Sequence, residues 1–258
     1  MHLTLPHVRA TPKRMSAAAT HPIPPAVLVT GTGTGIGKTA LTVALVQAVR
    51  QAGWPAIALK PYESGCEGAP ADALALATAS GQPTLARHPR FYRARAPVAP
   101  WAATRMGETP PPSVDVMAGT LMQMAAQCAG GAAMMDAPLV WAESAGGLFV
   151  PLDAGSTFAD LAAKLAWPLL LVAPNRLGVL SHTIATAEAA RARGLHVHAI
   201  VLNDVEDDAA VDDPSRRHNA DILRTHLAPL PVHTFAHHVD DPSRLAAAAT
   251  LLRALWLR

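Results

Sequence analysis

Cysteine is scarce in this chain of 258 residues, which contains only Cys66 and Cys128. Two cysteines outside any Cys-x-x-Cys pair provide no disulfide framework and are typical of a reducing cytosol. Long apolar runs are also missing, because no stretch reaches 18 residues and the longest, at 165–174, is interrupted by Trp167 and Pro168. We interpret that run as a buried strand. The sequence therefore predicts a cytoplasmic protein without a membrane partner.

Charge is low as well, at 16% of residues, and nearly balanced, with 21 Lys and Arg against 19 Asp and Glu. This balance offers no basic field for nucleic acid and no polybasic face for a membrane surface. Residues 1–25 lack the apolar segment of a secretory signal and hold five prolines, so we expect a disordered tail there, with Met15 as an alternative start. Residues 26–258 are long enough for one large α/β domain.

The order of apolar and amphipathic segments indicates the fold. Short apolar runs at 26–30, 56–60, 139–143, 169–173, 197–203 and 232–236 are predicted strands, and 39–52 and 179–193 have helical spacing. Apolar strands that alternate with helices favour a doubly wound, mostly parallel sheet covered on both faces. Ligands of such sheets bind beyond the carboxyl ends of the strands.

The stretch "VLVTGTGTGIGKTAL" at 27–41 fits two phosphate-binding signatures. A short-chain dehydrogenase would also need a tyrosine followed four residues later by lysine. The chain has two tyrosines, Tyr62 and Tyr92, and the residues four positions later are Cys66 and Ala96. The dehydrogenase interpretation therefore fails, and the run is predicted to be a P-loop.

The P-loop interpretation requires a cation for the phosphates, a hydroxyl for Mg²⁺, and acidic groups that share the metal. Lys38 and Thr39 supply the first two, although five residues rather than four separate Gly31 from Gly37. Asp72, where a helix opens, and Glu143, at a strand end, are candidate acids; a helix N-cap and a solvated strand end are the alternatives. Lys60 ends another strand and is either a second phosphate-site cation or a surface lysine.

Taken in order, these motifs resemble the dethiobiotin synthetase family between about residues 26 and 240. The landmarks are the five-spaced loop, "KPYESG" at 60–65, "DALAL" at 72–76, "ESAGGLFVPLD" at 143–153, "RLGVLSHT" at 176–183 and "VLNDV" at 201–205. The resemblance implies a P-loop ligase that uses ATP and Mg²⁺ to convert 7,8-diaminononanoate and CO₂ into dethiobiotin. It also implies a homodimer with active sites at the interface.

The resemblance assigns roles residue by residue. It implies that Lys60 is catalytic together with Lys38 and Thr34, which contact the phosphates. It also implies that Thr39, Asp72 and Glu143 bind Mg²⁺. The implied ATP-binding residues are Gly35, Ile36, Gly37, Lys38, Thr39, Ala40, Asp72, Glu143, Ser144, Ala145, Gly146, Asn203, Asp204, Phe235, Ala236 and His237. The implied substrate-binding residues are Ser64, Arg176, Gly178, Val179 and Ser181, and those after Ser64 act from the partner subunit.

Several positions depart from the family pattern. Gly33 and Gly35 stand where the family has acids, Ser144 replaces a glycine, and Ala99-Pro100-Trp101 replaces a Ser-Pro-His triplet. The phosphate and metal residues are intact, so these changes bear on substrate handling more than on ATP use. Two other functions stay open: an amide ligase of cobalamin synthesis, which normally needs an additional glutamine-hydrolysing domain, and a partitioning-type ATPase switch, which would need a basic or amphipathic face.

Overall fold

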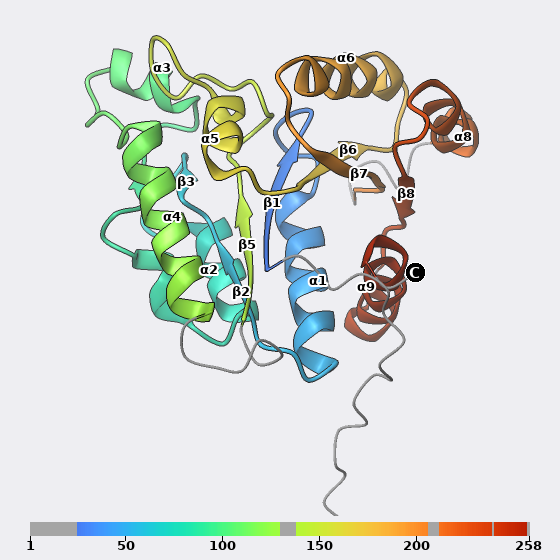
Figure 1. Ribbon diagram of the computed structural model, residues 1–258, viewed down its shortest axis with the longest axis horizontal. Helices are drawn as coiled ribbons and strands as arrows, with labels where there is room; N and C mark the ends of the chain where they lie inside the picture. The colour runs from blue at the N-terminus through green and yellow to red at the C-terminus, as the bar shows by residue number, and fades with distance from the viewer. Residues whose placement is uncertain (1–24, 130–137, 206–211, 239, 257–258) are drawn as a thin grey trace, which may run out of the picture.

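The computed structural model describes residues 25–129, 138–205, 212–238 and 240–256, so the expected tail lies almost entirely outside the described residues. Its helices and strands follow one another as labelled in Figure 1. In chain order they are β1 (Ala26–Gly31), α1 (Lys38–Gln51), β2 (Ala56–Leu59), β3 (Tyr62–Glu63), α2 (Ala71–Ala79), η1 (Pro83–Arg87), β4 (Tyr92–Arg93), α3 (Pro100–Arg105), α4 (Val114–Ala129), β5 (Leu139–Glu143), α5 (Phe158–Leu165), β6 (Leu169–Pro174), α6 (Val179–Ala192), β7 (Val197–Asn203), α8 (Arg216–His226), β8 (Val232–Phe235) and α9 (Asp241–Trp256).

Six strands form one parallel sheet in the order β2-β5-β1-β6-β7-β8. All six predicted strands are present, each ending within one residue of its predicted bounds. The predicted helices at 39–52 and 179–193 correspond to α1 and α6. The doubly wound, mostly parallel fold is therefore confirmed, and every strand end in this sheet points to the same edge.

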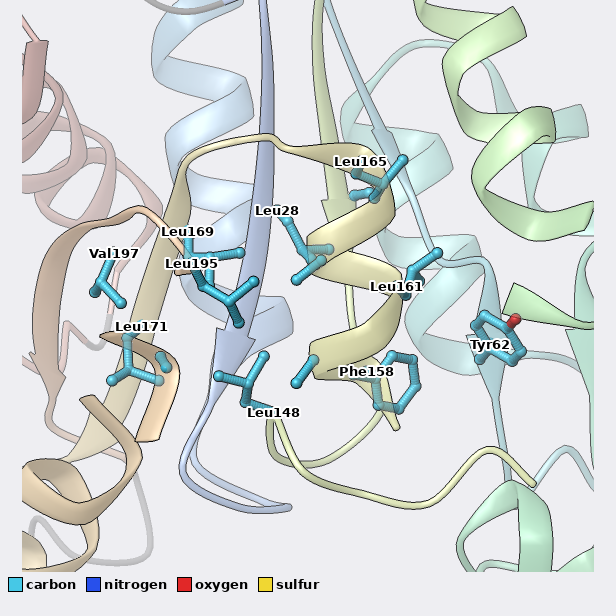
Figure 2. Close-up of a cluster of buried hydrophobic side chains, with 14 of the residues drawn as sticks. Leu28, Tyr62, Leu148, Phe158, Leu161, Leu165, Leu169, Leu171, Leu195 and Val197 are labelled. Atoms are coloured by element: carbon cyan, nitrogen blue, oxygen red, sulfur yellow. The ribbon is translucent and has the colours of Figure 1, made fainter. Parts of the chain in front are cut away.

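The sheet has a hydrophobic core on each face because neighbouring strand residues point in opposite directions. In β1, Leu28 faces the core under α4, α5, α6 and α8, whereas Val27 and Val29 face the core under α1 and α9. Helices α1 and α9 lie side by side (Figure 1). Figure 2 shows α5 laid over the first core, with Leu161, Phe158 and Leu165 among the strand leucines. Both faces are thus covered, as the continuous apolar strands predict.

Several elements were not predicted, and α5 is the most informative. It begins at a capping box. The Thr157 hydroxyl accepts a hydrogen bond from the amide of Ala159, and the Asp160 carboxylate accepts one from the amide of Thr157. It ends at Ala166, whose φ of 51° breaks the helix before the strand starts at 169. The apolar run 165–174 is therefore a helix end, a turn and a strand. Among the described residues, no helix is long and apolar enough to cross a membrane.

Removing the Phe158 ring should strongly destabilise the fold. The side chain is fully buried and packs edge-to-face on Tyr62, with ring centroids 5.4 Å apart (Figure 2). Phe158→Ala should lower the free energy of unfolding by about 3–5 kcal/mol, measured by urea denaturation. Phe149→Ala is the control, since that ring is 36% exposed and should cost no more than about 1 kcal/mol. Equal losses in both variants would contradict this account of the core.

Candidate functional site

A cleft of about 700 Å³ opens at the carboxyl edge of the sheet. Its walls come from the P-loop, from the ends of β2, β5, β7 and β8, and from the loops that follow them. Eighteen of the predicted site residues line it: Thr34, Gly35, Ile36, Gly37, Lys38, Thr39, Ala40, Lys60, Ser64, Asp72, Glu143, Ala145, Gly146, Asn203, Asp204, Phe235, Ala236 and His237. Segments up to 200 residues apart in sequence therefore meet in one cavity, as expected for a parallel sheet.

The P-loop is held closed by two side chains. Lys38 Nζ donates a hydrogen bond to the carbonyl of Gly33 at 2.8 Å, and Asn203 Nδ2 donates to the carbonyl of Ile36 at 3.0 Å. Gly37 precedes α1 with a φ of 76°, a left-handed conformation that favours glycine. Burial, together with the charge of Lys60, lowers the pKa of Lys38 to about 8. The loop thus presents backbone amides and a cation at a helix N-terminus, which suits a phosphate.

Below the loop, a cluster of charges joins β2, β5 and α2. The Lys60 ammonium donates to Glu143 Oε1 at 2.5 Å and to Asp72 Oδ2 at 2.8 Å, and the Thr39 hydroxyl donates to Glu143 Oε1 at 2.7 Å. Burial acts to lower the pKa of Lys60, but the charges of Glu143 and Asp72 and their hydrogen bonds outweigh it and raise the pKa. Burial acts to raise the pKa of Asp72, and Lys60 lowers it on balance. Both shifts favour the charged forms of Lys60 and Asp72.

These contacts decide between the alternatives left by the sequence. The N-cap position of α2 is Pro70, so Asp72 is not the N-cap residue, and the Asp72 carboxylate bonds Lys60 instead. Glu143 is fully buried and Lys60 is 4% exposed, so neither is a solvated strand end. Asp72, Glu143 and Thr39 lie in one hydrogen-bonded cluster with Lys60. Their role as metal ligands remains a prediction.

The chemistry of this donor set fits Mg²⁺. Two carboxylates and a hydroxyl are hard oxygen donors, which that cation prefers, and it commonly takes its other ligands from water and phosphate. Glu143 Oε2 is buried without a hydrogen-bond partner among the described residues, so one oxygen of the cluster has acceptor capacity to spare. Among those residues no group of three His, Cys, Asp or Glu side chains is arranged to bind a metal. The candidate metal site is therefore the set of oxygens on Thr39, Asp72 and Glu143.

Five predicted residues do not line the cleft. Ser144 lies directly behind it, where its hydroxyl bonds Thr30 at 2.9 Å and its carbonyl accepts from Lys60 at 3.4 Å. The other four are Arg176, Gly178, Val179 and Ser181, which precede or begin α6. Gly178 has a φ of 89° and caps α6, next to Leu177, which is 81% exposed. Within one chain these four are separate from the P-loop site.

The cleft also contains residues that the sequence reasoning missed. Glu63, Val150, Val205, His238 and Arg244 line it, together with the segment 97–100. Glu63 lies inside the quoted "KPYESG" motif, so its position was visible although its role was not. Arg244 enters from the first turn of α9, an element that no motif predicted. Segment 97–100 includes Ala99 and Pro100, which immediately precede Trp101.

Comparisons with known proteins identify relatives of this chain. A family model described as an AAA domain matches residues 25–234. The ATP-dependent dethiobiotin synthetase of Anaeromyxobacter dehalogenans (strain 2CP-C) is 44% identical over 79% of this chain and 87% of its own length. The corresponding synthetase of Gloeobacter violaceus is 38% identical over 90% and 93%. A solved ParA family ATPase from Chlorobium tepidum aligns at 14% identity over 88% and 92%, with a TM-score of 0.45, too weak to bear on function.

Placing a methyl group at Gly37 should disrupt the loop. A Cβ there would overlap with the Asn203 amide nitrogen, which holds Ile36, and would force a side chain into a left-handed φ. Gly37→Ala should weaken ATP binding at least about tenfold, measured by calorimetry, because the buried hydrogen bond from Asn203 to the Ile36 carbonyl is lost. Gly53→Ala is the matched control, because Gly53 has a φ of 86° at the other end of α1 and meets no atom within 4 Å.

Both variants share a conformational strain of about 1–2 kcal/mol, which urea denaturation should report in each. Only Gly37→Ala should change the ATP affinity. If Gly53→Ala weakens ATP binding to the same extent, the loss reflects strain in α1 and not the contact between Gly37 and Asn203.

Proposed function

Since the chain belongs to the dethiobiotin synthetase family, we propose that it converts 7,8-diaminononanoate, CO₂ and ATP into dethiobiotin, ADP and phosphate. The ATP-dependent enzymes of this family form carbon–nitrogen bonds in biotin biosynthesis. In the proposed reaction one amine takes up CO₂ as a carbamate, and a carbamate oxygen attacks the γ-phosphorus while the bond to ADP breaks. The second amine then attacks the carbamate carbon, phosphate leaves, and the urea ring closes.

The observation that carries this proposal is the pair of buried lysines in the cleft. A carbamate and a γ-phosphate are both anionic, and two anions react only where fixed positive charge holds them together. Lys38 follows the P-loop and Lys60 ends β2, and both line the same cavity while being at most 6% exposed. We assign Lys38 and Thr34 to the phosphates, Lys60 to the charge that develops during transfer, and Ser64 to the carbamate.

Thr39, Asp72 and Glu143 are the proposed holders of Mg²⁺, which when bound would neutralise charge on the phosphate oxygens. Glu143 and Asp72 also form ion pairs with Lys60, so the same two carboxylates orient its ammonium group. We assign Asn203, Asp204 and the segment 235–237 to the base of the nucleotide. A carboxamide such as that of Asn203 can both donate and accept hydrogen bonds, as adenine requires.

The diamine chain ends in a carboxylate, which needs a site of its own. We propose that the start of α6 in a second copy of the chain supplies it, through Gly178, Val179 and Ser181 with Arg176 nearby. Free amide groups and the positive end of a helix dipole favour a carboxylate. The active form would then be a homodimer. A cytoplasmic location remains a prediction from the sequence.

Product analysis tests the reaction directly. Protein, MgATP, 7,8-diaminononanoate and ¹³C-bicarbonate should give a product with the mass of dethiobiotin plus one heavy carbon, together with ADP and phosphate in equal amounts. Mixtures without the diamine or without bicarbonate should release no phosphate above background. ATP hydrolysis that ignores both substrates would instead support the ATPase-switch alternative.

Lys60→Ala should lower kcat by about 10²–10³-fold, as is typical when one charge-stabilising donor is removed. ATP affinity should change much less, because Lys38 and the loop amides remain. The control is Lys164→Ala, which removes an exposed lysine that pairs with Asp115 at 2.7 Å outside the cleft. Steady-state kinetics with each substrate varied would measure both. Near-normal turnover in Lys60→Ala would rule out the role assigned to Lys60.

A further inference from the structure

Glu63 makes an unusual connection between the small β3–β4 sheet and helix α2. Glu63 is 6% exposed, and its two carboxylate oxygens accept separate backbone hydrogen bonds. Oε1 accepts from the amide of Asp72 at 2.8 Å, and Oε2 accepts from the amide of Ala73 at 2.9 Å. A residue from another element thus satisfies the first free amides of the helix.

Helix α2 needs this connection because its own sequence gives it no cap. Its N-cap residue is Pro70, which makes no side-chain hydrogen bond to the helix. The loop between β3 and α2 contains Gly65 and Gly68 in left-handed conformations, φ 76° and 94°, and its hydrogen bonds to Ala94 and Ala96 come from its beginning, at Gly65 and Cys66. A buried carboxylate on the first-turn amides also interacts favourably with the helix dipole. Glu63 therefore fixes where α2 begins.

Asp72 is held from both sides in consequence. Its backbone amide is bonded to Glu63, and its carboxylate is bonded to the Lys60 ammonium at 2.8 Å. Asp72 is more exposed than its partners, with a side chain 45% exposed against 3% for Lys60. Packing does little to orient such an exposed carboxylate. Its orientation therefore depends on the hydrogen bond between the Asp72 backbone amide and Glu63.

We propose that Glu63 is a positioning residue that sets the Asp72 carboxylate toward Thr39 and Glu143 at the magnesium site. The inference rests on the proposed metal role of these three residues. Partners that orient a metal ligand typically change metal affinity by about 10- to 100-fold when they are mutated. Glu63 also lines the cleft, so direct contact with the diamine is the competing interpretation.

The test is Glu63→Gln, which keeps the shape but replaces one acceptor oxygen with a donor facing a backbone amide. Exchange of the Asp72 and Ala73 amides, followed by NMR, should accelerate at least about tenfold. The affinity for Mg²⁺ in the presence of ADP, measured by calorimetry, should fall about 10- to 100-fold. The diamine KM at saturating Mg²⁺ should stay within about twofold of the wild-type value, since no substrate contact is removed.

The chain offers a matched control in Glu108→Gln. Glu108 also accepts two backbone hydrogen bonds, from Arg95 and Ala96 at 2.8 Å each, but it does not line the cleft. Its variant should leave Mg²⁺ affinity unchanged. Glu63→Asp, which keeps the charge on a shorter side chain, provides the same comparison should Glu63→Gln not fold.

Two results would overturn the proposal. Faster amide exchange with unchanged Mg²⁺ affinity would make Glu63 a helix cap only, and a raised diamine KM alone would make it a substrate contact. A wild-type enzyme that binds ADP equally well with and without Mg²⁺ would instead refute the metal site itself.

Discussion

The Lys60–Glu143 ion pair is the constraint on which the rest of the site depends. Both groups are almost completely buried, and an unpaired charge at either position would be strongly destabilising. Strands β2 and β5 are neighbours, and Leu59 pairs with Ala142, so Lys60 and Glu143 are the next residues on adjacent strands. A register shift of one residue would turn one of them to the opposite face. The pairing of two apolar strands therefore determines where the charges meet.

From that pair the cluster extends into α1, α2 and the P-loop. Thr39 brings in α1 through Glu143, and Asp72 brings in α2 through Lys60. Lys38, one residue before Thr39, turns back to the loop carbonyl of Gly33. The two ammonium groups lie close enough for Lys60 to lower the pKa of Lys38, and the two carboxylates offset that repulsion. The charges of the site thus hold one another in place through direct contacts between elements that are far apart in the sequence.

Sequence patterns predicted the sheet well because each strand is buried on both faces and reads as an uninterrupted apolar run. They predicted the cluster because Lys60 and Glu143 stand at strand ends and Thr39 and Asp72 stand at helix starts, where a parallel sheet gathers side chains. The role of Glu63 could not be predicted, because it depends on a two-residue strand and on backbone amides nine and ten residues away. Helix α9 and Arg244 were missed for a similar reason, since the alanine-rich sequence of α9 has no motif.

The two loop glycines that depart from the family pattern are not equivalent in this structure. Gly35 has a φ of 70°, so any other residue there would strain the loop, whereas Gly33 has no such requirement and a Cβ at that position would meet no atom within 4 Å. Glycine at 35 therefore serves the conformation of the loop, and glycine at 33 does not. Lys38 contacts position 33 only through its backbone carbonyl, which any residue would provide. The missing acid at 33 thus leaves the phosphate-binding geometry intact, and its consequence falls on whatever the cleft holds beside the phosphates.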